Sequence, residues 1–355
     1  MSDDLLRRLR DVIQIDPGDR GLRADPVSNL INACPDDFAA ACRSLAAPHP
    51  YPSPHDGERG RGEGRPKLLI VTGFYIADAQ PPGGETDGPP GALFLARALQ
   101  PLGVEVFLAT DSYCVEALRT GLEACQLQEH VGLIELPQVA WDEQGYEDQV
   151  LGAVGRSSVP LTHLLAVERV GPSHTTKSLK GQVATMNETL ALFQDDVWPE
   201  QRDRCYSMSG RDLTPYTSPA HLLFEHAARQ EPPVVTVGVG DGGNEIGMGK
   251  IPWDVIRRNI RGGAKIACRV PVDHLIVAGV SNWGAYALAA GVRALRGAPF
   301  DAELFSVERE RQLIQMMVDF GPLVDGRTKR RAATVDGLTW EQYAAPLEQI
   351  AALLA

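Results

Sequence analysis

A loop rich in glycine and acidic residues carries the clearest chemical pattern in the chain. The stretch VTVGVGDGGNEIGMGK, residues 235 to 250, leaves a β-branched apolar run and presents Asp241, Asn244 and Glu245 among six glycines. Carboxylate and amide oxygens are hard ligands, which Mg²⁺ and Mn²⁺ prefer. We therefore predict a divalent metal, Mg²⁺ or Mn²⁺, held by Asp241 and Glu245.

The same loop also contains a dinucleotide-binding spacing. Gly238, Gly240 and Gly243 match G-x-G-x-x-G, a pattern in which backbone N–H groups approach a pyrophosphate. A dinucleotide loop runs straight into a helix, whereas here the next helix is expected only near Pro252. Asp241 would also bring negative charge to the phosphates. A nicotinamide-dependent oxidoreductase stays open as an alternative on the spacing alone.

Two further loops place charged side chains after apolar runs. Glu85, Thr86 and Asp87 begin the segment ETDGPPG, and Glu168 and Arg169 directly follow the run LLAV. A charge at the end of a buried strand is costly unless it meets a ligand, a metal or an opposite charge. Turn chemistry with a helix cap would explain the first loop, and a rim salt bridge would explain the second. Functional and structural interpretations both stay open.

A fourth loop, GVSNWG, precedes the helical pattern AYALAAGVRAL. Ser281 or Asn282 is expected to cap this helix, which would leave the first N–H groups of the helix free to receive a carboxylate. Capping alone would also explain both residues.

These loops are positioned by alternating apolar runs and amphipathic segments. Runs that are almost entirely apolar are expected to form buried strands at 67–74, 104–110, 131–136, 163–168, 233–239 and 273–279. The alternation predicts an α/β fold with a mostly parallel, doubly wound sheet and helices on both faces. Ligands of such sheets bind beyond the carboxyl ends of the strands, where the four loops are expected to meet.

We divide the chain into three parts. A helical lead-in covers residues 1–50, and a flexible connection rich in Pro, Gly and charge covers 51–66. An α/β domain follows over 67–355, with an insertion at about 174–203 that has helical rhythm.

Composition narrows the class of partner. The 355 residues carry a net charge of −12, which argues against nucleic acid or an anionic membrane as a partner and favours a small molecule. The six cysteines form no C-x-x-C pair, and no apolar run approaches the roughly 18 residues of a membrane span. We expect a soluble, cytoplasmic protein; whether it forms a homo-oligomer stays open.

Five segments together resemble the D-glutamate cyclase family, which includes stand-alone microbial proteins and the carboxy-terminal part of a mitochondrial enzyme. The segments are TDGPPGA (86–92), VERVG (167–171), CYSMSGRD (205–212), GVGDGGNEIGMGK (238–250) and VAGVSNWGAYAL (277–288). Two features depart from the family. About thirty residues separate the second segment from the third, and Ser207 and Ser209 stand where a larger polar pair is expected.

The resemblance implies the conversion of D-glutamate to 5-oxo-D-proline and water. A metal at Asp241 and Glu245 would act on the γ-carboxylate as a Lewis acid, and Glu168 or Asp87 would move the proton of the α-ammonium.

The substrate is expected to contact several backbone and side-chain groups. Its α-carboxylate would lie on the N–H groups of Ser281 and Asn282 or on Arg169. The other expected contacts are Thr86, Gly240, Gly242, Gly243 and Asn244.

Three alternatives remain beside this function. A metal-dependent lyase or hydrolase could act on a related amino-dicarboxylate, and the oxidoreductase follows from the glycine spacing. A non-catalytic protein that senses an amino acid or a metal is the third.

Overall fold

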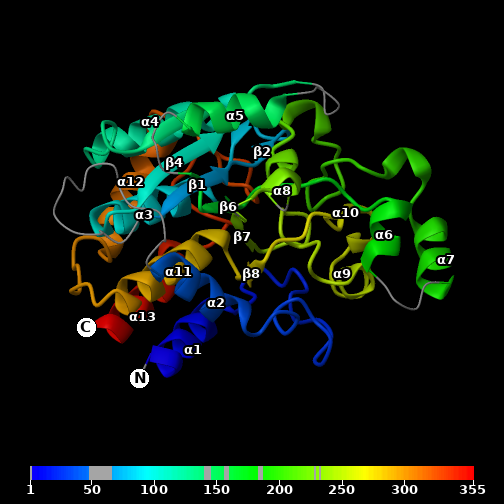
Figure 1. The fold of residues 1–355 in the computed structure, drawn as a ribbon, viewed down its shortest axis with the longest axis horizontal. Coiled ribbons are helices and arrows are strands. Elements are labelled where there is room, and N and C mark those ends of the chain that lie inside the picture. Colours follow the sequence, from blue (N-terminus) through cyan, green and yellow to red (C-terminus); the bar gives the residue numbers. More distant parts are fainter. Residues whose placement is uncertain are drawn as a thin grey trace.

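A parallel sheet forms the centre of the protein (Figure 1). The computed structural model describes residues 2–47, 66–139, 145–155, 160–182, 187–227, 229–231 and 233–355. The strands of this sheet are β1 (Lys67–Thr72), β4 (Glu105–Thr110), β5 (Gly132–Glu135), β6 (His163–Val167), β7 (Val235–Gly240) and β8 (His274–Val277). They coincide with the six runs predicted from the sequence, which confirms the α/β fold.

The strand order creates a topological switch point at the middle of the sheet. The order is β5-β4-β1-β6-β7-β8, and every neighbouring pair is parallel. The chain therefore winds outward in one direction from β1 and returns to build the other half from β6. The loops after β1 and β6 consequently diverge, which opens a crevice at the carboxyl edge between them. A short antiparallel hairpin, β2 (Tyr75–Ile76) with β3 (Gly83–Gly84), lies within the loop after β1.

Successive residues of the central strands enter two separate hydrophobic cores. Leu68 and Ile70 of β1 belong to one core, and Leu69 and Val71 belong to the other. This alternation follows from the pleat of a strand that is buried on both faces. The helices of the first core are α1 (Ser2–Ile13), α2 (Asp37–Ala46), α3 (Pro89–Leu99), α4 (Ser112–Ala124), α11 (Ser281–Leu295), α12 (Val307–Asp319) and α13 (Trp340–Leu354). Those of the second are α5 (Tyr146–Val154), α6 (Thr176–Gln182), α7 (Asn187–Asp196), α8 (His221–Ala227), α9 (Trp253–Asn259) and α10 (Gly263–Ile266).

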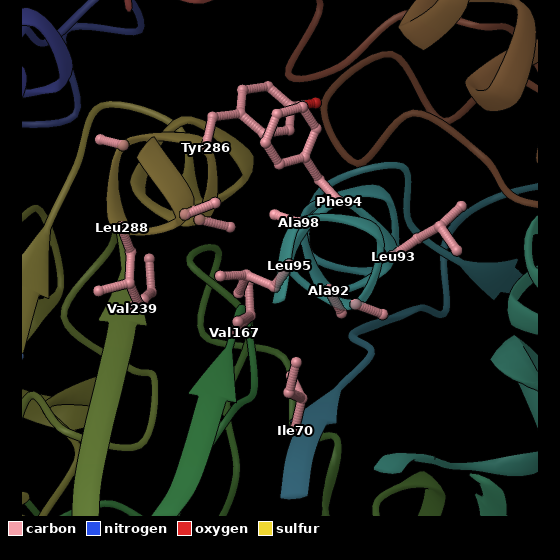
Figure 2. Close-up of a cluster of buried hydrophobic side chains, with 14 of the residues drawn as sticks. Ile70, Ala92, Leu93, Phe94, Leu95, Ala98, Val167, Val239, Tyr286 and Leu288 are labelled. Atoms are coloured by element: carbon pink, nitrogen blue, oxygen red, sulfur yellow. The ribbon is translucent and has the colours of Figure 1, made fainter. Parts of the chain in front are cut away.

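The first core is densest where α3 and α11 lie on the central strands. Figure 2 shows Phe94 of α3 against Tyr286 of α11, above Val167 and Val239 at the ends of β6 and β7. The two rings are tilted, with centroids 4.5 Å apart. This packing fixes the N-termini of both helices at the carboxyl edge of the sheet, close to the switch point.

The helical lead-in is part of the same body. Helices α1 and α2 bury apolar side chains against α11, beside α13 (Figure 1). The predicted connection at 51–66 lies, apart from residue 66, outside the described residues. The segment at 174–203 contains α6 and α7, as its helical rhythm indicates. Among the described residues, no helix combines the length and the apolar character that crossing a membrane requires.

Candidate functional site

A cavity of about 320 Å³ opens at the carboxyl edge, at the switch point between β1 and β6. The loops after β1, β6 and β7 contribute to it, as the parallel topology predicts. Two segments from the ends of the described chain complete it: the stretch between α1 and α2, and the loop before α13. The lining residues are Gly18, Arg20, Phe74, Ile76, Glu85, Glu168, Ser207, Met208, Ser209, Asp241, Gly326, Arg327, Lys329 and Asp336.

Acidic side chains gather beside this cavity in two groups that share Asp241. One group is Asp87, Asp241 and Asp336, and the other is Glu168, Asp241 and Glu245. In each group, one oxygen from every carboxylate lies within 4.8 Å of the others. The sequence predicted four of these five carboxylates as a site, and the structure brings all four together. Asp336 was missed because an isolated Asp-Gly pair in a loop is ordinary turn chemistry.

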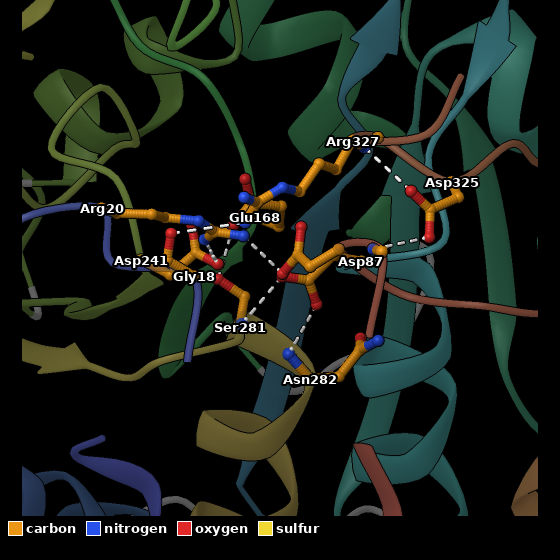
Figure 3. Close-up of polar contacts among 12 residues, drawn as sticks. Gly18, Arg20, Asp87, Glu168, Asp241, Ser281, Asn282, Asp325 and Arg327 are labelled. Atoms are coloured by element: carbon orange, nitrogen blue, oxygen red, sulfur yellow. Dashed lines mark hydrogen bonds and ion pairs between the residues drawn. The ribbon is translucent and has the colours of Figure 1, made fainter. Parts of the chain in front are cut away.

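Arg20 is the cation that reaches this acidic cluster. Its guanidinium pairs with Asp241 and with Asp336, and Figure 3 shows it among the carboxylates. The carboxylate of Asp16 shapes the turn that presents it, by accepting bonds from the backbone N–H groups of Arg20, Gly21 and Leu22 at 2.9 to 3.0 Å. Burial alone would lower the pKa of Arg20, but the two carboxylates outweigh it and raise that pKa well above its usual value.

Arg20 was not among the site residues predicted from the sequence. The residue belongs to the turn DPGDRG (16–21), where glycine and proline indicate a surface loop, and only the tertiary structure brings it to the sheet edge.

Crowding raises the pKa values of the clustered carboxyl groups. Burial is the largest cause for Asp87, followed by the charge of Asp336, and together they raise its pKa to about 7. Burial and the neighbouring charge of Asp241 raise the pKa of Glu168 well above its usual range. Burial likewise raises the pKa values of Asp241, Glu245 and Glu85. The crowding therefore favours protonation of the cluster unless a further cation compensates its charge.

Glu168 is held at the cavity in a strained backbone conformation. Its φ of 46° lies in the left-handed region, which costs a residue with a side chain about 1 kcal/mol or more. The backbone N–H donates to the Val239 carbonyl at 3.1 Å, and the hydroxyl of Ser281 donates to Oε2 at 2.5 Å. Gly88, with φ of 96°, leaves the space that the Glu168 side chain fills. Strain of this kind concentrates at functional sites.

Asp87 accepts the first N–H groups of α11. The backbone N–H of Ser281 donates to Oδ2 at 2.9 Å, and that of Asn282 donates to Oδ1 at 2.8 Å. The expected capping role of Ser281 or Asn282 was wrong, because the residue at the N-cap is Val280. The amides expected to be free for a substrate carboxylate hold the carboxylate of Asp87 instead.

Arg169 does not reach the cavity. It is fully buried, pairs with Asp111 and donates to the Ser218 carbonyl at 2.8 Å. Burial would lower its pKa, and the charge of Asp111 reverses this effect. The expected contact with a substrate carboxylate is therefore replaced by a buried ion pair, and the two neighbours Glu168 and Arg169 face different surroundings.

Thr86 also lies away from the cavity. Its hydroxyl donates to the Thr334 carbonyl at 2.6 Å, and its backbone N–H donates to the Val324 carbonyl at 3.0 Å. Thr86 thereby fastens the loop after β1 to the loop before α13, which carries Asp336.

The glycine loop packs acidic side chains tightly and does not start a helix. A Cβ at Gly242 would lie 2.9 Å from Oε1 of Glu245, so a larger residue there would require the Glu245 side chain to shift. Glu245 accepts the N–H of Gly243 through Oε2 at 2.9 Å, while its Oε1 is buried without a hydrogen-bond partner. Asn244 donates to the Tyr206 carbonyl at 2.7 Å, and its Oδ1 is equally unpaired.

This loop differs from a dinucleotide-binding turn in position and course. It follows β7, the fifth strand of the sheet along the chain, whereas a dinucleotide fingerprint follows the first. The next helix, α9, begins at Trp253 after a bridge between Val170 and Glu245 and further turns. Gly240 ends β7, and neither it nor Gly243 lines the cavity.

Fold and site together define a doubly wound α/β protein with an acidic cavity at its switch point. A family model described as "D-glutamate cyclase-like, C-terminal" matches residues 9–191 and 195–351. The chain belongs to this D-glutamate cyclase-like family. It is also 31% identical over 294 residues to "D-glutamate cyclase, mitochondrial" of Homo sapiens, in a match that covers 82% of this chain. The chain spans 39% of the length of that relative.

Proposed function

We propose that this protein cyclises D-glutamate to 5-oxo-D-proline and water with the help of a divalent metal ion. The name of the human relative and the family description support the reaction. The observation that carries the proposal is the convergence of Glu168, Asp241 and Glu245 beside the cavity, within 4.8 Å of one another.

The reaction forms a bond between the α-nitrogen and the carbon of the γ-carboxylate and breaks one carbon–oxygen bond of that carboxylate. The ammonium group loses two protons, and the departing oxygen receives both and leaves as water. The nitrogen must therefore be deprotonated before it attacks, and the γ-carboxylate, already anionic, must tolerate further charge. An enzyme for this step needs a proton carrier and an electropositive group close together.

The contacts of Arg20 favour one of the two acidic groups as the metal site. Its guanidinium pairs with Asp241, which both groups share, and with Asp336, so the group that contains Glu168 and Glu245 is the less compensated of the two. Glu245 has an unpaired buried oxygen, as does the neighbouring Asn244. Hard oxygens without partners fit Mg²⁺ or Mn²⁺, so we assign the ion to Asp241 and Glu245, with Asn244 beside them. Such an ion would supply Lewis acidity to the γ-carboxylate.

Glu168 is the carboxyl group best placed to move the protons. It lines the cavity, and the hydroxyl of Ser281 orients its Oε2. Asp87, the other candidate from the sequence, does not line the cavity and is held by two amides of α11. We therefore assign proton transfer to Glu168 and the fixing of the α11 N-terminus to Asp87.

A related substrate is the second candidate, because Ser207 and Ser209 line the cavity. These are the positions where the sequence departs from the expected larger polar pair. Short hydroxyl side chains leave more room and other hydrogen-bonding groups, which suits a metal-dependent lyase or hydrolase acting on another amino-dicarboxylate.

A substrate panel tests the proposal. The purified protein is incubated with D-glutamate, L-glutamate, glutamine and N-carbamoyl-glutamate, with Mn²⁺ or with EDTA, and products are followed by mass spectrometry. We expect D-glutamate to lose one water with Mn²⁺ and to be unchanged with EDTA. Turnover of a different compound would identify that compound as the substrate in place of D-glutamate. Equal turnover in EDTA would contradict the role of the metal ion.

A further inference from the structure

The loop from Asp325 to Gly337 is folded around one buried carboxylate. Asp325 Oδ1 accepts the backbone N–H groups of Arg327 and Thr328 at 2.9 and 2.6 Å. Its Oδ2 accepts the hydroxyl of Thr334 and the N–H of Gly337 at 2.7 and 2.8 Å. Burial alone would raise the pKa of Asp325, but these hydrogen bonds lower it. These hydrogen bonds therefore hold the backbone of the loop in one conformation, which fixes the positions from which its side chains extend.

This loop places two cations at the mouth of the cavity. Arg327 and Lys329 both line it, and neither has a carboxylate within ion-pair distance among the described residues. Arg327 donates to the Gly18 carbonyl at 3.3 Å, and Figure 3 shows it extending from the Asp325 loop over the acidic group. Lys329 is close enough to Glu85 to lower the pKa of that carboxyl group, against the larger effect of burial.

The sign of the charge consequently differs between the inner end of the cavity and its mouth. Its inner end carries Glu168 and Asp241, and the one cation that the described residues place there, Arg20, is already paired twice. Its mouth carries Arg327 and Lys329, whose charges are available. A zwitterion entering the cavity would direct its ammonium group inward and an anionic group toward the mouth.

We propose that Arg327 and Lys329 form an anion subsite that binds the α-carboxylate of the substrate, the carboxylate that does not react. This inference rests on the proposed function. From the sequence, the α-carboxylate was expected to contact Arg169 or the first amides of α11. The proposal places this contact at the mouth of the cavity instead. Because the subsite would contact the carboxylate that does not react, it should determine binding and specificity more than the chemical step.

Steady-state kinetics of Arg327→Gln and Lys329→Gln test the subsite. Each variant loses one charge-assisted contact, so KM for D-glutamate should rise about 10- to 100-fold while kcat changes less than about threefold. Arg330→Gln is the matched control, since Arg330 is exposed on the same loop but does not line the cavity. Unchanged KM in both variants, or an equal rise in the control, would overturn the inference.

A substrate analogue without the α-carboxylate gives a second readout. 4-Aminobutyrate keeps the amine and the reacting carboxylate, so wild-type protein should bind it about 10-fold or more weakly than D-glutamate. The double variant of Arg327 and Lys329 should bind both compounds about equally in calorimetry. Discrimination that survives in the double variant contradicts the subsite. Because this measurement needs no turnover, a wild-type protein that binds D-glutamate without converting it would contradict only the proposed function.

Discussion

The guanidinium of Arg20 contacts the carboxylate of Asp241, and this pair joins the segment between α1 and α2 to the glycine loop after β7. Asp241 belongs to both acidic groups, so the pair sits at the point where the negative charge is most concentrated. A buried carboxylate cluster is stable only when protons or cations neutralise it. Arg20 is therefore the permanent counter-ion of a site that we expect to bind a second cation.

Replacing Arg20 tests this role. Arg20→Gln removes one partner of a buried ion pair, and unfolding in urea with EDTA should show a loss of about 3 kcal/mol. Added Mg²⁺ should recover part of the loss, because the ion supplies the missing positive charge. Arg8→Gln, a change at an exposed position of α1, is the control and should have no effect. An Arg20 variant as stable as wild type in EDTA would contradict the counter-ion role.

Two single substitutions distinguish the acidic groups as metal sites. Asp241→Asn removes a carboxylate from both groups, so metal affinity and turnover should fall together by at least about 100-fold. Asp336→Asn affects only the group that lacks Glu168 and Glu245, so Mn²⁺ affinity should change less than about threefold. Isothermal titration calorimetry with Mn²⁺ measures both. A larger loss in the Asp336 variant than in the Asp241 variant would move the ion to the other group.

The raised pKa of Asp87 predicts how stability depends on pH. The pKa rises from 3.8 to about 7 on folding, so the folded state binds more protons than the unfolded state between these values. Its contribution to stability is complete below about pH 4 and is lost as pH rises through about 7. In EDTA the free energy of unfolding should fall in this window, by at most about 1.4 kcal/mol per pH unit for this group.

A variant and a metal titration isolate this effect. Asp87→Asn should flatten the slope, although Asp241 and Glu168 contribute in the same direction. Mg²⁺ should stabilise the wild-type protein more at pH 8 than at pH 5, because deprotonated carboxylates bind it. A slope in the variant as steep as in wild type would show that Asp87 is not a source of it.

Gly88 offers a test of the strained geometry at Glu168. A Cβ at this position would lie 2.7 Å from Cβ of Glu168 and 2.8 Å from the hydroxyl of Thr72. Gly88→Ala should therefore cost about 3 kcal/mol or more and displace Glu168, with a loss of turnover in the protein that remains folded. Gly297→Ala is the control, because Gly297 also has a positive φ but no atom within 4 Å. It should cost only about 1 kcal/mol. Thermal unfolding and turnover are measured for both variants. Equal losses in the two would contradict the prediction.

The sequence predicted those parts of the site that depend on the sheet alone. Buried parallel strands are almost entirely apolar, so their ends could be located, and the carboxyl ends of parallel strands meet at one edge. Asp87, Glu168, Asp241 and Glu245 follow such ends and do lie together. The direction of Arg169 could not be predicted, because Glu168 before it has a left-handed backbone, which breaks the side-chain alternation of an extended strand. Its partner, Asp111, follows β4 and was not among the predicted site residues.

The parts contributed by distant turns could not be predicted. Arg20, Asp336 and the cations of the Asp325 loop lie in short segments without periodicity, whose composition indicates only a turn. Their position depends on tertiary contacts such as the hydrogen bond from Thr86 to Thr334. A single sequence contains no local pattern for such contacts.

The charged residues of the cavity come from segments far apart in the chain, and this separation determines when the site can form during synthesis. Arg20 leaves the ribosome long before any strand of the sheet, whereas Asp336, its second partner, emerges only just ahead of α13. Until then the nascent protein can assemble the sheet and the loops after β1, β6 and β7 without the loop that completes the cavity. A nascent chain that still lacks this loop would therefore expose an incomplete acidic crevice.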